Sequence, residues 1–516
     1  MTMIVTLLLL ALSAGPGFEE AVLFLSGASC IEELDESTLE HYRALELHPV
    51  ELNMATRSRL ISSGLMSAFQ AASLLDARAQ TGDILSYTEL GLLDGFSPQY
   101  AEALRPFTTL SSTSAPGERP RNGLHHDLML RGAAKESGGR AVAGGLKYKL
   151  TAGDRAELGW ATRTTYSDPE FRVGTVSAAL YGKKHLGKLV FGHFNARFGQ
   201  GLTQWSGFSL SPWSGTGSFR RNGTGFSSTS SFSAAHCGGA VDFMSGHWTA
   251  GCAYSFPDKL AMGNIAYTGK RFTAGLTLTG KAAGADFKWG FTGGVLYGEA
   301  AVNEGGPAGV AGVYWVPVYG SKVAAMLRYN DGQAEAAAGA GGKDYEALVY
   351  WSAQQFRALA KCSHDFTIWK ITATPKLRLA ARKKDYWRLE SRGELQLSLP
   401  PFVLNSRLDI VRGKAVSWLF NSEAGIDSGS FRCWTRWTLF CVDEWDDRIY
   451  VYERDAPGNF NVPAYYGRGQ ALSLAGAWRP SRKHRIDFRV SYIEYPWMTE
   501  EKDSKFEVKL QYQLSL

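Results

Sequence analysis

Arginine and aromatic side chains gather in two glycine-containing stretches, and they are the candidates for binding chemistry. Guanidinium groups and aromatic rings are frequent at contact surfaces. In one interpretation these residues lie in the lumen or at the rim of a β-barrel and contact a partner. In the other, which we favour, the glycines let strands kink and the rings fill the rim. The candidate contact residues are Arg197, Gln200, Trp205, Arg220, Arg221, Arg448, Tyr450, Tyr452, Tyr465, Tyr466 and Arg468.

The sequence offers little support for catalysis or for a bound cofactor. HExxH, GxSxG and Walker A motifs are absent, and His125 and His126 would point to opposite faces of a strand, which makes a poor metal site. We therefore expect no enzyme, no cofactor and no metal, although a serine and a histidine that meet only in the folded chain stay an alternative. The cysteines lack CxxC or zinc spacing and are expected to be free, buried thiols: Cys30, Cys237, Cys252, Cys362, Cys433 and Cys441.

From residue 123 onward, apolar and polar residues alternate with a period of two, as in Lys505–Leu516. The same pattern occupies 146–150, 272–278, 389–399, 404–410 and 486–492, where the polar face carries mainly Arg, Lys and Glu. Charged side chains suit the wet interior of a wide barrel, while the apolar face suits lipid. Trp and Tyr residues near the strand ends suit interfacial girdles.

These strands predict a mainly β fold: a large antiparallel transmembrane β-barrel with a small all-α N-terminal domain. About 395 residues, at roughly 20 per strand with its connection, predict about 16–20 strands. The final strand is expected to close the barrel against residues 124–130. A multi-sheet soluble protein is the alternative, because half-buried strands also alternate. No run of 18 apolar residues predicts a membrane-spanning helix.

Charge divides the chain into two parts. Between residues 19 and 106 there are 14 acidic residues, five arginines and no lysine, which gives a net charge of −9. The whole chain carries +6, so the remainder carries about +15. An acidic front segment could therefore dock against the basic remainder.

The segment 49–110 predicts two copies of helix, glycine-containing turn and helix, about thirty residues apart. It resembles a tandem helix-hairpin-helix domain of the kind found in competence-type DNA receptors and repair enzymes. The resemblance implies that the hairpin turns hold a DNA phosphate or a partner: Gly64, Leu65, Met66, Gly95, Phe96 and Ser97. The acidic charge of the segment disfavours nucleic acid, since phosphate neutralisation supplies most sequence-independent affinity. A packing or protein-contact role is favoured.

The predicted organisation is a signal peptide (1–15), an acidic helical segment (18–48), the helix-hairpin-helix domain (49–110), a linker (111–122) and the barrel (123–516). This order resembles exported proteins that join a periplasmic helix-hairpin-helix segment to an outer-membrane barrel. We predict a non-enzymatic scaffold or conduit whose periplasmic front domain contacts an envelope protein or plugs the barrel, with lipid around the wall. DNA uptake and a small-solute porin are the alternatives.

Overall fold

The computed structural model describes residues 17–110, 123–153, 155–168, 170–182, 185–232, 234–291, 293–317, 320–456, 461–481, 483–498 and 502–516. The predicted signal peptide and linker lie outside these ranges, and their boundaries stay predictions.

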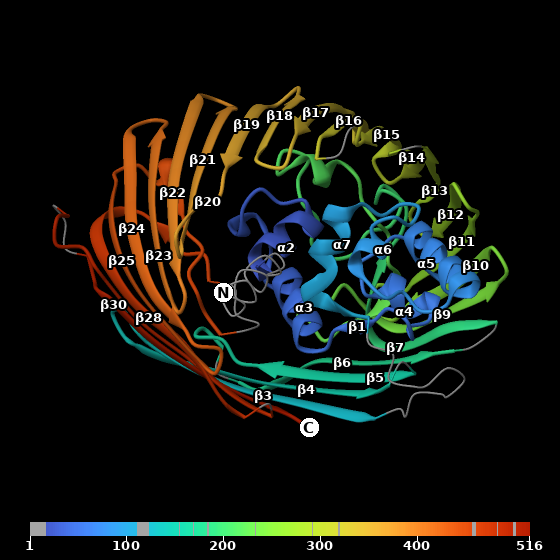
Figure 1. Cartoon of the computed structure of the whole chain (residues 1–516), viewed down its shortest axis with the longest axis horizontal. Coiled ribbons are helices and arrows are strands. Elements are labelled where there is room, and N and C mark those ends of the chain that lie inside the picture. Colours follow the sequence, from blue (N-terminus) through green and yellow to red (C-terminus); the bar gives the residue numbers. More distant parts are fainter. Residues whose placement is uncertain are drawn as a thin grey trace, which may run out of the picture.

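A closed barrel of antiparallel strands forms the wall of the molecule (Figure 1). The described residues contribute 26 strands to this sheet, but β8 (Gly225–Ser228) pairs only with β7 and β20 (Phe366–Ile368) only with β21. The wall therefore has 24 strands. The predicted number, 16–20, was too low because many strands have only eight to ten residues and are joined by turns as short as 246–247.

The first twelve wall strands are β3 (Leu124–Glu136), β4 (Arg140–Ala152), β5 (Ala156–Arg163), β6 (Arg172–Tyr181), β7 (Leu186–Arg197), β9 (His236–Ser245), β10 (Trp248–Ser255), β11 (Leu260–Thr268), β12 (Phe272–Thr279), β13 (Ala283–Phe291), β14 (Gly294–Asn303) and β15 (Gly306–Trp315). The other twelve are β16 (Lys322–Asn330), β17 (Gln333–Gly341), β18 (Tyr345–Ser352), β19 (Phe356–Ser363), β21 (Ile371–Lys383), β22 (Trp387–Leu399), β23 (Phe402–Arg412), β24 (Val416–Asp427), β25 (Phe431–Val442), β28 (Gly467–Ser481), β29 (His484–Glu494) and β30 (Lys505–Ser515). A short pair, β26 (Ile449–Tyr450) and β27 (Ala464–Tyr465), lies outside the wall sheet.

The last strand closes the barrel as predicted. β30 pairs with β3 in a continuous register from Asp127 opposite Ser515 to Glu136 opposite Phe506. The barrel's first and last residues therefore share one end, which we call the termini end. Because consecutive strands are antiparallel, the long connections 198–235 and 443–466 both start from the opposite end, the loop end.

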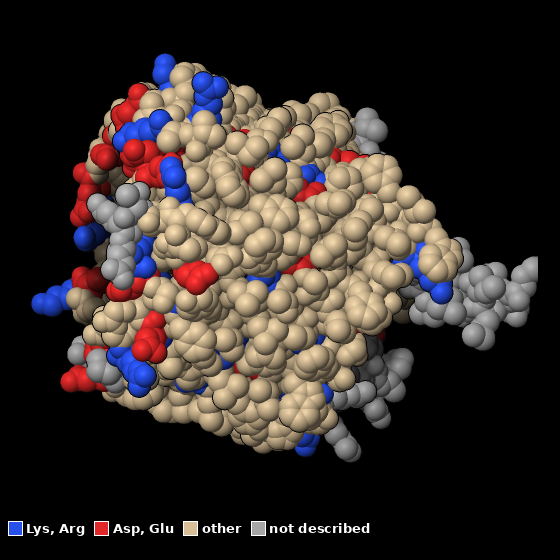
Figure 2. Space-filling view, turned by 90° about the vertical axis from the view of Figure 1, so that its left-hand side faces the viewer, with Lys and Arg blue, Asp and Glu red and all other residues tan. Residues whose placement is uncertain are grey.

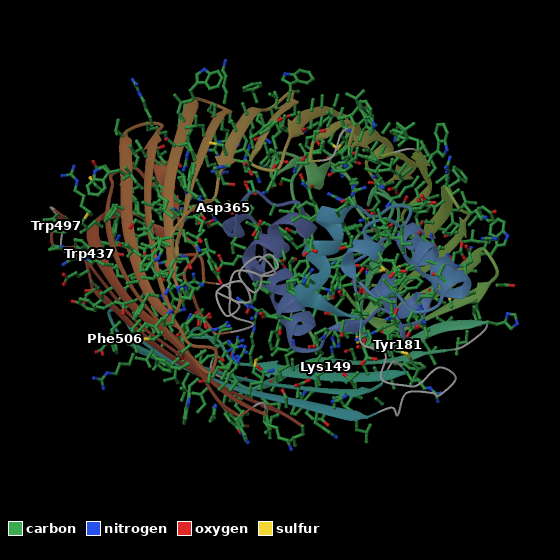
Figure 3. All side chains as sticks on the ribbon, viewed as in Figure 1. Lys149, Tyr181, Asp365, Trp437, Trp497 and Phe506 are labelled. Carbon is green, nitrogen blue, oxygen red and sulfur yellow. The ribbon has the colours of Figure 1, made fainter. Side chains whose placement is uncertain are left out.

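The two faces of the wall differ as the alternation predicts. Trp437 and Phe506 are 44% and 43% exposed on the outside, whereas Lys149 and Tyr181 lie on the inside (Figure 3). Figure 2 shows one outer face as a broad uncharged band with charged side chains gathered along one edge. The six cysteines are free as predicted, but none is fully buried: Cys252 and Cys362 are exposed, and the other four are half-buried.

None of the described helices is both long and apolar enough to cross a lipid bilayer.

The front segment forms a helical domain, residues 17–110. Its elements are α2 (Phe18–Ser26), η1 (Ile31–Glu33), α3 (Glu36–Leu47), β1 (Val50–Glu51), α4 (Arg57–Ser62), α5 (Ala68–Thr81), α6 (Tyr87–Leu90), α7 (Pro98–Leu104), η2 (Arg105–Phe107) and β2 (Thr108–Thr109). Side-chain caps begin the helices: Thr56 caps α4, Ser67 forms a capping box with Gln70 on α5, and Ser86 caps α6. Gly82 ends α5 as predicted.

One hydrophobic core holds the helical domain together. Buried side chains from Ala21 in α2 to Phe107 in η2 belong to a single cluster. The Asn53 side chain accepts from Ile84 N (2.9 Å) and donates to Ile84 O and Leu110 O (3.0 and 2.8 Å). It therefore connects the end of the domain to its middle. The domain should move as one body.

The helical domain lies inside the barrel (Figure 1). Its side chains bond to β3, β4 and β5 on one side of the lumen and to β21, β22 and β23 elsewhere around it. On α4, Arg57 donates to Gly246 O in a turn at the termini end (3.5 Å). The domain therefore extends from the termini end to the middle strand positions, where it touches the wall.

Candidate functional site

Four acidic side chains of the helical domain contact six cations of the inner wall. These pairs are Glu32 with Arg392 and Arg407, Glu33 with Arg378, Glu36 with Arg131 and Arg163, and Glu40 with Lys147. The opposite charges of the two parts, visible in the sequence, thus meet in the lumen. The reverse polarity also occurs, since Arg59 of α4 pairs with Glu157 of β5 (3.1 Å).

Glu32 and its two arginines form the most enclosed of these contacts between the helical domain and the wall. The Glu32 carboxylate is 9% exposed and lies 2.5 Å from Arg407 Nη1 and 3.4 Å from Arg392 Nη1. Tyr452 N also donates to Glu32 Oε1 (3.3 Å). Burial alone would raise the pKa of Glu32, but the two guanidinium groups outweigh burial and hold its pKa well below 4.5. Glu32 is therefore a carboxylate in a closely fitted cationic niche.

Strand geometry builds this niche. Arg392 of β22 stands directly opposite Asp409 of β23, and Arg407 is two residues before Asp409 on the same inward face. Asp409 accepts from Arg392 Nε (2.8 Å) and from Arg407 Nε (2.5 Å), which orients both guanidinium groups toward the lumen. On the other side, η1 presents Glu32 just before Asp35 caps α3.

Two segments from the loop end also fold into the lumen. The first lumenal loop, residues 198–224, is held by Glu299 of β14, whose carboxylate accepts from the backbone N–H groups of Gln200, Leu202 and Thr203. Farther along, Glu346 of β18 accepts from Thr216 N (3.0 Å). Buried wall carboxylates therefore fix this loop through its backbone.

The candidate residues of the first loop come together. Gln200 is 4% exposed and bonds with Arg221 through both its backbone and its amide. The guanidinium groups of Arg197 and Arg221 lie 5.6 and 5.2 Å from the Trp205 ring centroid. Arg220 instead lies over Tyr314 of β15 (4.3 Å). These residues fill the lumen, and a contact of theirs with a partner stays a prediction.

The candidates of the second lumenal loop, residues 443–466, divide between lumen and rim. Tyr452 approaches Glu32 as described, and Tyr465 is buried with its hydroxyl on Glu453. Half-buried Arg448 donates to the hydroxyl of exposed Tyr450 (2.7 Å). Tyr466 packs edge-on against Trp445, and Arg468 pairs with Asp443 at the exposed rim (2.7 Å).

The two predicted hairpin turns pack inside the helical domain. Leu65 and Met66 are 1% and 2% exposed, whereas Gly64 and Gly95 are exposed. Gly64 faces His41 and Thr224. Gly95 has φ +83° and lies under the Phe69 ring, so no other residue fits there.

The helices of the second hairpin connect the two turns. Tyr100 OH donates to Leu65 O, Phe96 packs edge-on against Tyr100, and Ser97 caps α7. The helix-hairpin-helix assignment itself stays a prediction.

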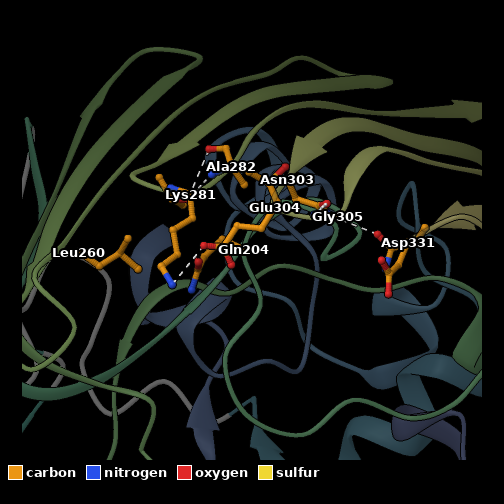
Figure 4. A pocket seen from close by; sticks show the side chains of 11 residues that line it. Gln204, Leu260, Lys281, Ala282, Asn303, Glu304, Gly305 and Asp331 are labelled. Atoms are coloured by element: carbon orange, nitrogen blue, oxygen red, sulfur yellow. Dashed lines mark hydrogen bonds and ion pairs between the residues drawn. The ribbon is translucent and has the colours of Figure 1, made fainter.

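A polar pocket of about 410 Å³ opens at the loop end (Figure 4). Thr203 and Gln204 of the first lumenal loop belong to its lining, together with the turns after β12, β14 and β16. Lys281 and Glu304 form an ion pair there (3.4 Å). The described residues contain no group of three His, Cys, Asp or Glu side chains placed to hold a metal ion.

Sequence reasoning missed the residues that hold the lumen together: Glu32, Arg392, Arg407, Glu299 and Glu346. The only available indication was regional, namely the acidic front segment and the charged alternate positions of strands such as 389–399. Pairing between residues more than 300 positions apart is set by the closed barrel and has no local sequence signature.

No protein-family model matches the chain, and no curated protein does. Among solved structures, OpdO of Pseudomonas aeruginosa shares 9% identity and a TM-score of 0.33, covering 76% of this chain and 97% of that chain. OpdL of Pseudomonas aeruginosa shares 8% identity at a TM-score of 0.35, covering 76% of this chain and 98% of that chain. The outer membrane protein OpdK of the same organism shares 9% identity at a TM-score of 0.33, covering 76% of this chain and 99% of that chain. Similarity at this level carries no argument about activity or substrate.

Proposed function

We propose that this protein is a non-enzymatic outer-membrane conduit for small solutes, which its own helical domain keeps closed. The carrying observation is that residues 17–110 occupy the lumen and are held there by ion pairs to opposite parts of the wall. A closed antiparallel wall with an apolar outside supports a membrane location, since it leaves no unpaired strand edge in lipid. The helical domain would then face the periplasm.

Release of the helical domain would open the conduit. The domain has its own hydrophobic core, so it can leave the lumen without unfolding. An envelope protein that pulls on it is the partner we infer. Leu85 and Leu92, 83% and 80% exposed, are apolar side chains that such a partner could bind. Photo-crosslinking from position 92 in cells would test this contact, and no adduct with any envelope protein would count against it.

The two turns of the helical domain give no support to DNA binding. The turn N–H groups that would hold a phosphate are already used, because Leu65 N donates to Ser63 Oγ and Phe96 N donates to Leu93 O. The acidic face that surrounds η1 and α3 is directed at wall cations.

Deleting residues 17–110 should convert a closed protein into a conducting one. In planar lipid bilayers we expect rare openings from the full chain and a continuous, large conductance from the deletion variant, because a wide barrel loses the domain in its lumen. Circular dichroism and heat-modifiable migration would establish that the variant still forms a barrel. A folded deletion variant that conducts no better than the full chain would refute the proposal.

A further inference from the structure

The inner wall carries like charges on neighbouring strands, facing one another. The row nearer the loop end holds Arg357 of β19, Arg382 of β21 and Arg388 of β22. Arg382 stands directly opposite Arg357 on one side and Arg388 on the other. Four residues deeper, Lys361, Arg378 and Arg392 form a second row. Like charges at opposite positions destabilise a sheet by a few tenths to about 1 kcal/mol each. Stability alone therefore does not explain these two cation rows.

The rows run between the two lumenal loops. The Arg357 guanidinium lies 4.0 Å from the Trp213 ring centroid of the first loop. Arg388 donates to Asp446 O and Arg448 O of the second loop (2.6 and 3.1 Å). The cations thus form a strip from the loop end toward the niche around Glu32.

The helical domain supplies part of the counter-charge of the deeper row. Glu33 lies 3.5 Å from Arg378, and Glu32 lies 3.4 Å from Arg392. The wall supplies the rest, because Lys361 pairs with Glu346, Arg378 with Glu390 and Arg392 with Asp409. When the helical domain leaves, two carboxylates leave with it. The guanidinium groups of Arg392 and Arg407 would stay in place, since Asp409 of the wall orients both.

We propose that the niche filled by Glu32, formed by Arg392, Arg407 and Tyr452 N, is an oxyanion-binding site of the open conduit. Its ligands are small solutes bearing a carboxylate or a phosphate, guided there by the cation rows. Glu32 is then an internal competitor that occupies the site while the conduit is closed. Planar guanidinium groups and a backbone N–H are the donors that both kinds of oxyanion use. The solute class rests on the proposed conduit function; the binding site does not.

Competition between Glu32 and an added oxyanion in the full chain tests this site. Cys30 is the natural reporter, because burial and the nearby Glu33 and Glu32 raise its pKa to about 12 in the closed state. Its thiol should therefore react slowly with a polar maleimide until the helical domain is released. The other five cysteines are replaced by serine. Added oxyanion binds the niche only after Glu32 has left it, so it should favour the released domain and speed labelling of Cys30.

At about ten times its dissociation constant, the anion should speed labelling roughly tenfold. Acetate and inorganic phosphate are the two arms, and they decide whether carboxylates, phosphates or both are ligands. Sodium chloride at equal ionic strength and glycerol should give no such acceleration. Adding Arg392→Gln or Arg407→Gln should abolish the acceleration. Arg485→Gln should not, because Arg485 pairs with Asp487 on its own strand.

Glu32→Ala serves as the competition control: its niche is vacant in both states, so anions should not speed its labelling further. Labelling of the chain with Glu32 that neither anion speeds beyond the chloride control would overturn the site, as would acceleration that survives both arginine substitutions. The assay needs no conduction. A conduit that fails in bilayers while anions speed labelling would refute the proposed function and the solute class, but not the site.

Discussion

Glu32→Lys should release the helical domain from the lumen. The substitution removes the carboxylate that pairs with Arg392 and Arg407 and places a third cation between them, in a site where Glu32 is 9% exposed. Breaking a buried ion pair costs about 3–5 kcal/mol, and the added repulsion acts in the same direction. The opening equilibrium should therefore shift by at least a hundredfold.

Two measurements report this shift: faster labelling of Cys30 by a polar maleimide, and continuous conductance in place of rare openings. The matched control is Glu20→Lys, which makes the same charge change at an exposed residue of α2 for which the described structure shows no wall cation. Equal labelling rates in Glu32→Lys and Glu20→Lys would mean that the niche does not hold the domain.

Arg407→Gln should loosen both the helical domain and the second lumenal loop. Arg407 is 8% exposed, pairs with Glu32 and Asp409, and donates to Tyr450 O (3.1 Å). Without it two buried carboxylates share Arg392, so we expect a loss of about 3–5 kcal/mol. Limited proteolysis should then cut within 443–456 as well as 17–110.

The double variant Glu32→Gln/Arg407→Gln should cost less than the sum of the two single changes, because the stranded carboxylate at position 32 is also gone. Arg485→Gln is the matched single control, another lumenal arginine with a wall partner. Strict additivity would show that Glu32 and Arg407 do not act through one another.

The sequence predicted those features of the fold that have a local cause. Alternation in 389–399 and 505–516 predicted the inward charged face and the closing strand, because side-chain direction in a strand depends only on position. Helix limits also have a local cause, since Ser86 caps α6 and Gly82 ends α5. The strand number was wrong because turn lengths vary freely without changing the pattern within strands.

The site could be predicted only as a difference in charge. Glu32 and Arg407 are 375 positions apart, and their contact depends on barrel closure and on the position of the helical domain within it. The inward course of the first loop depends on Glu299, about a hundred residues downstream, in a strand that is otherwise rich in Gly and Ala. Such long-range contacts have no spacing rule that a single sequence would reveal.

In the proposed mechanism, solutes pass only after the helical domain has left the barrel lumen. Replacing Ser58 of α4 and Gly187 of β7 by cysteine offers a lock between the domain and the wall. A Cβ added at Gly187 lies 3.2 Å from Ser58 Oγ, the atom that a cysteine sulfur would replace, so the two side chains are close enough to form a disulfide. The lock is placed in a Glu32→Lys chain whose native cysteines are serine.

Conductance of this chain, measured before and after a reducing agent is added to the same bilayer, is the decisive experiment. The oxidised protein should conduct no current and should open fully on reduction, because one hydrophobic core lets a single lock hold the whole domain. Equal conductance in the two states would contradict it, because solutes would then pass while the helical domain stays in the lumen.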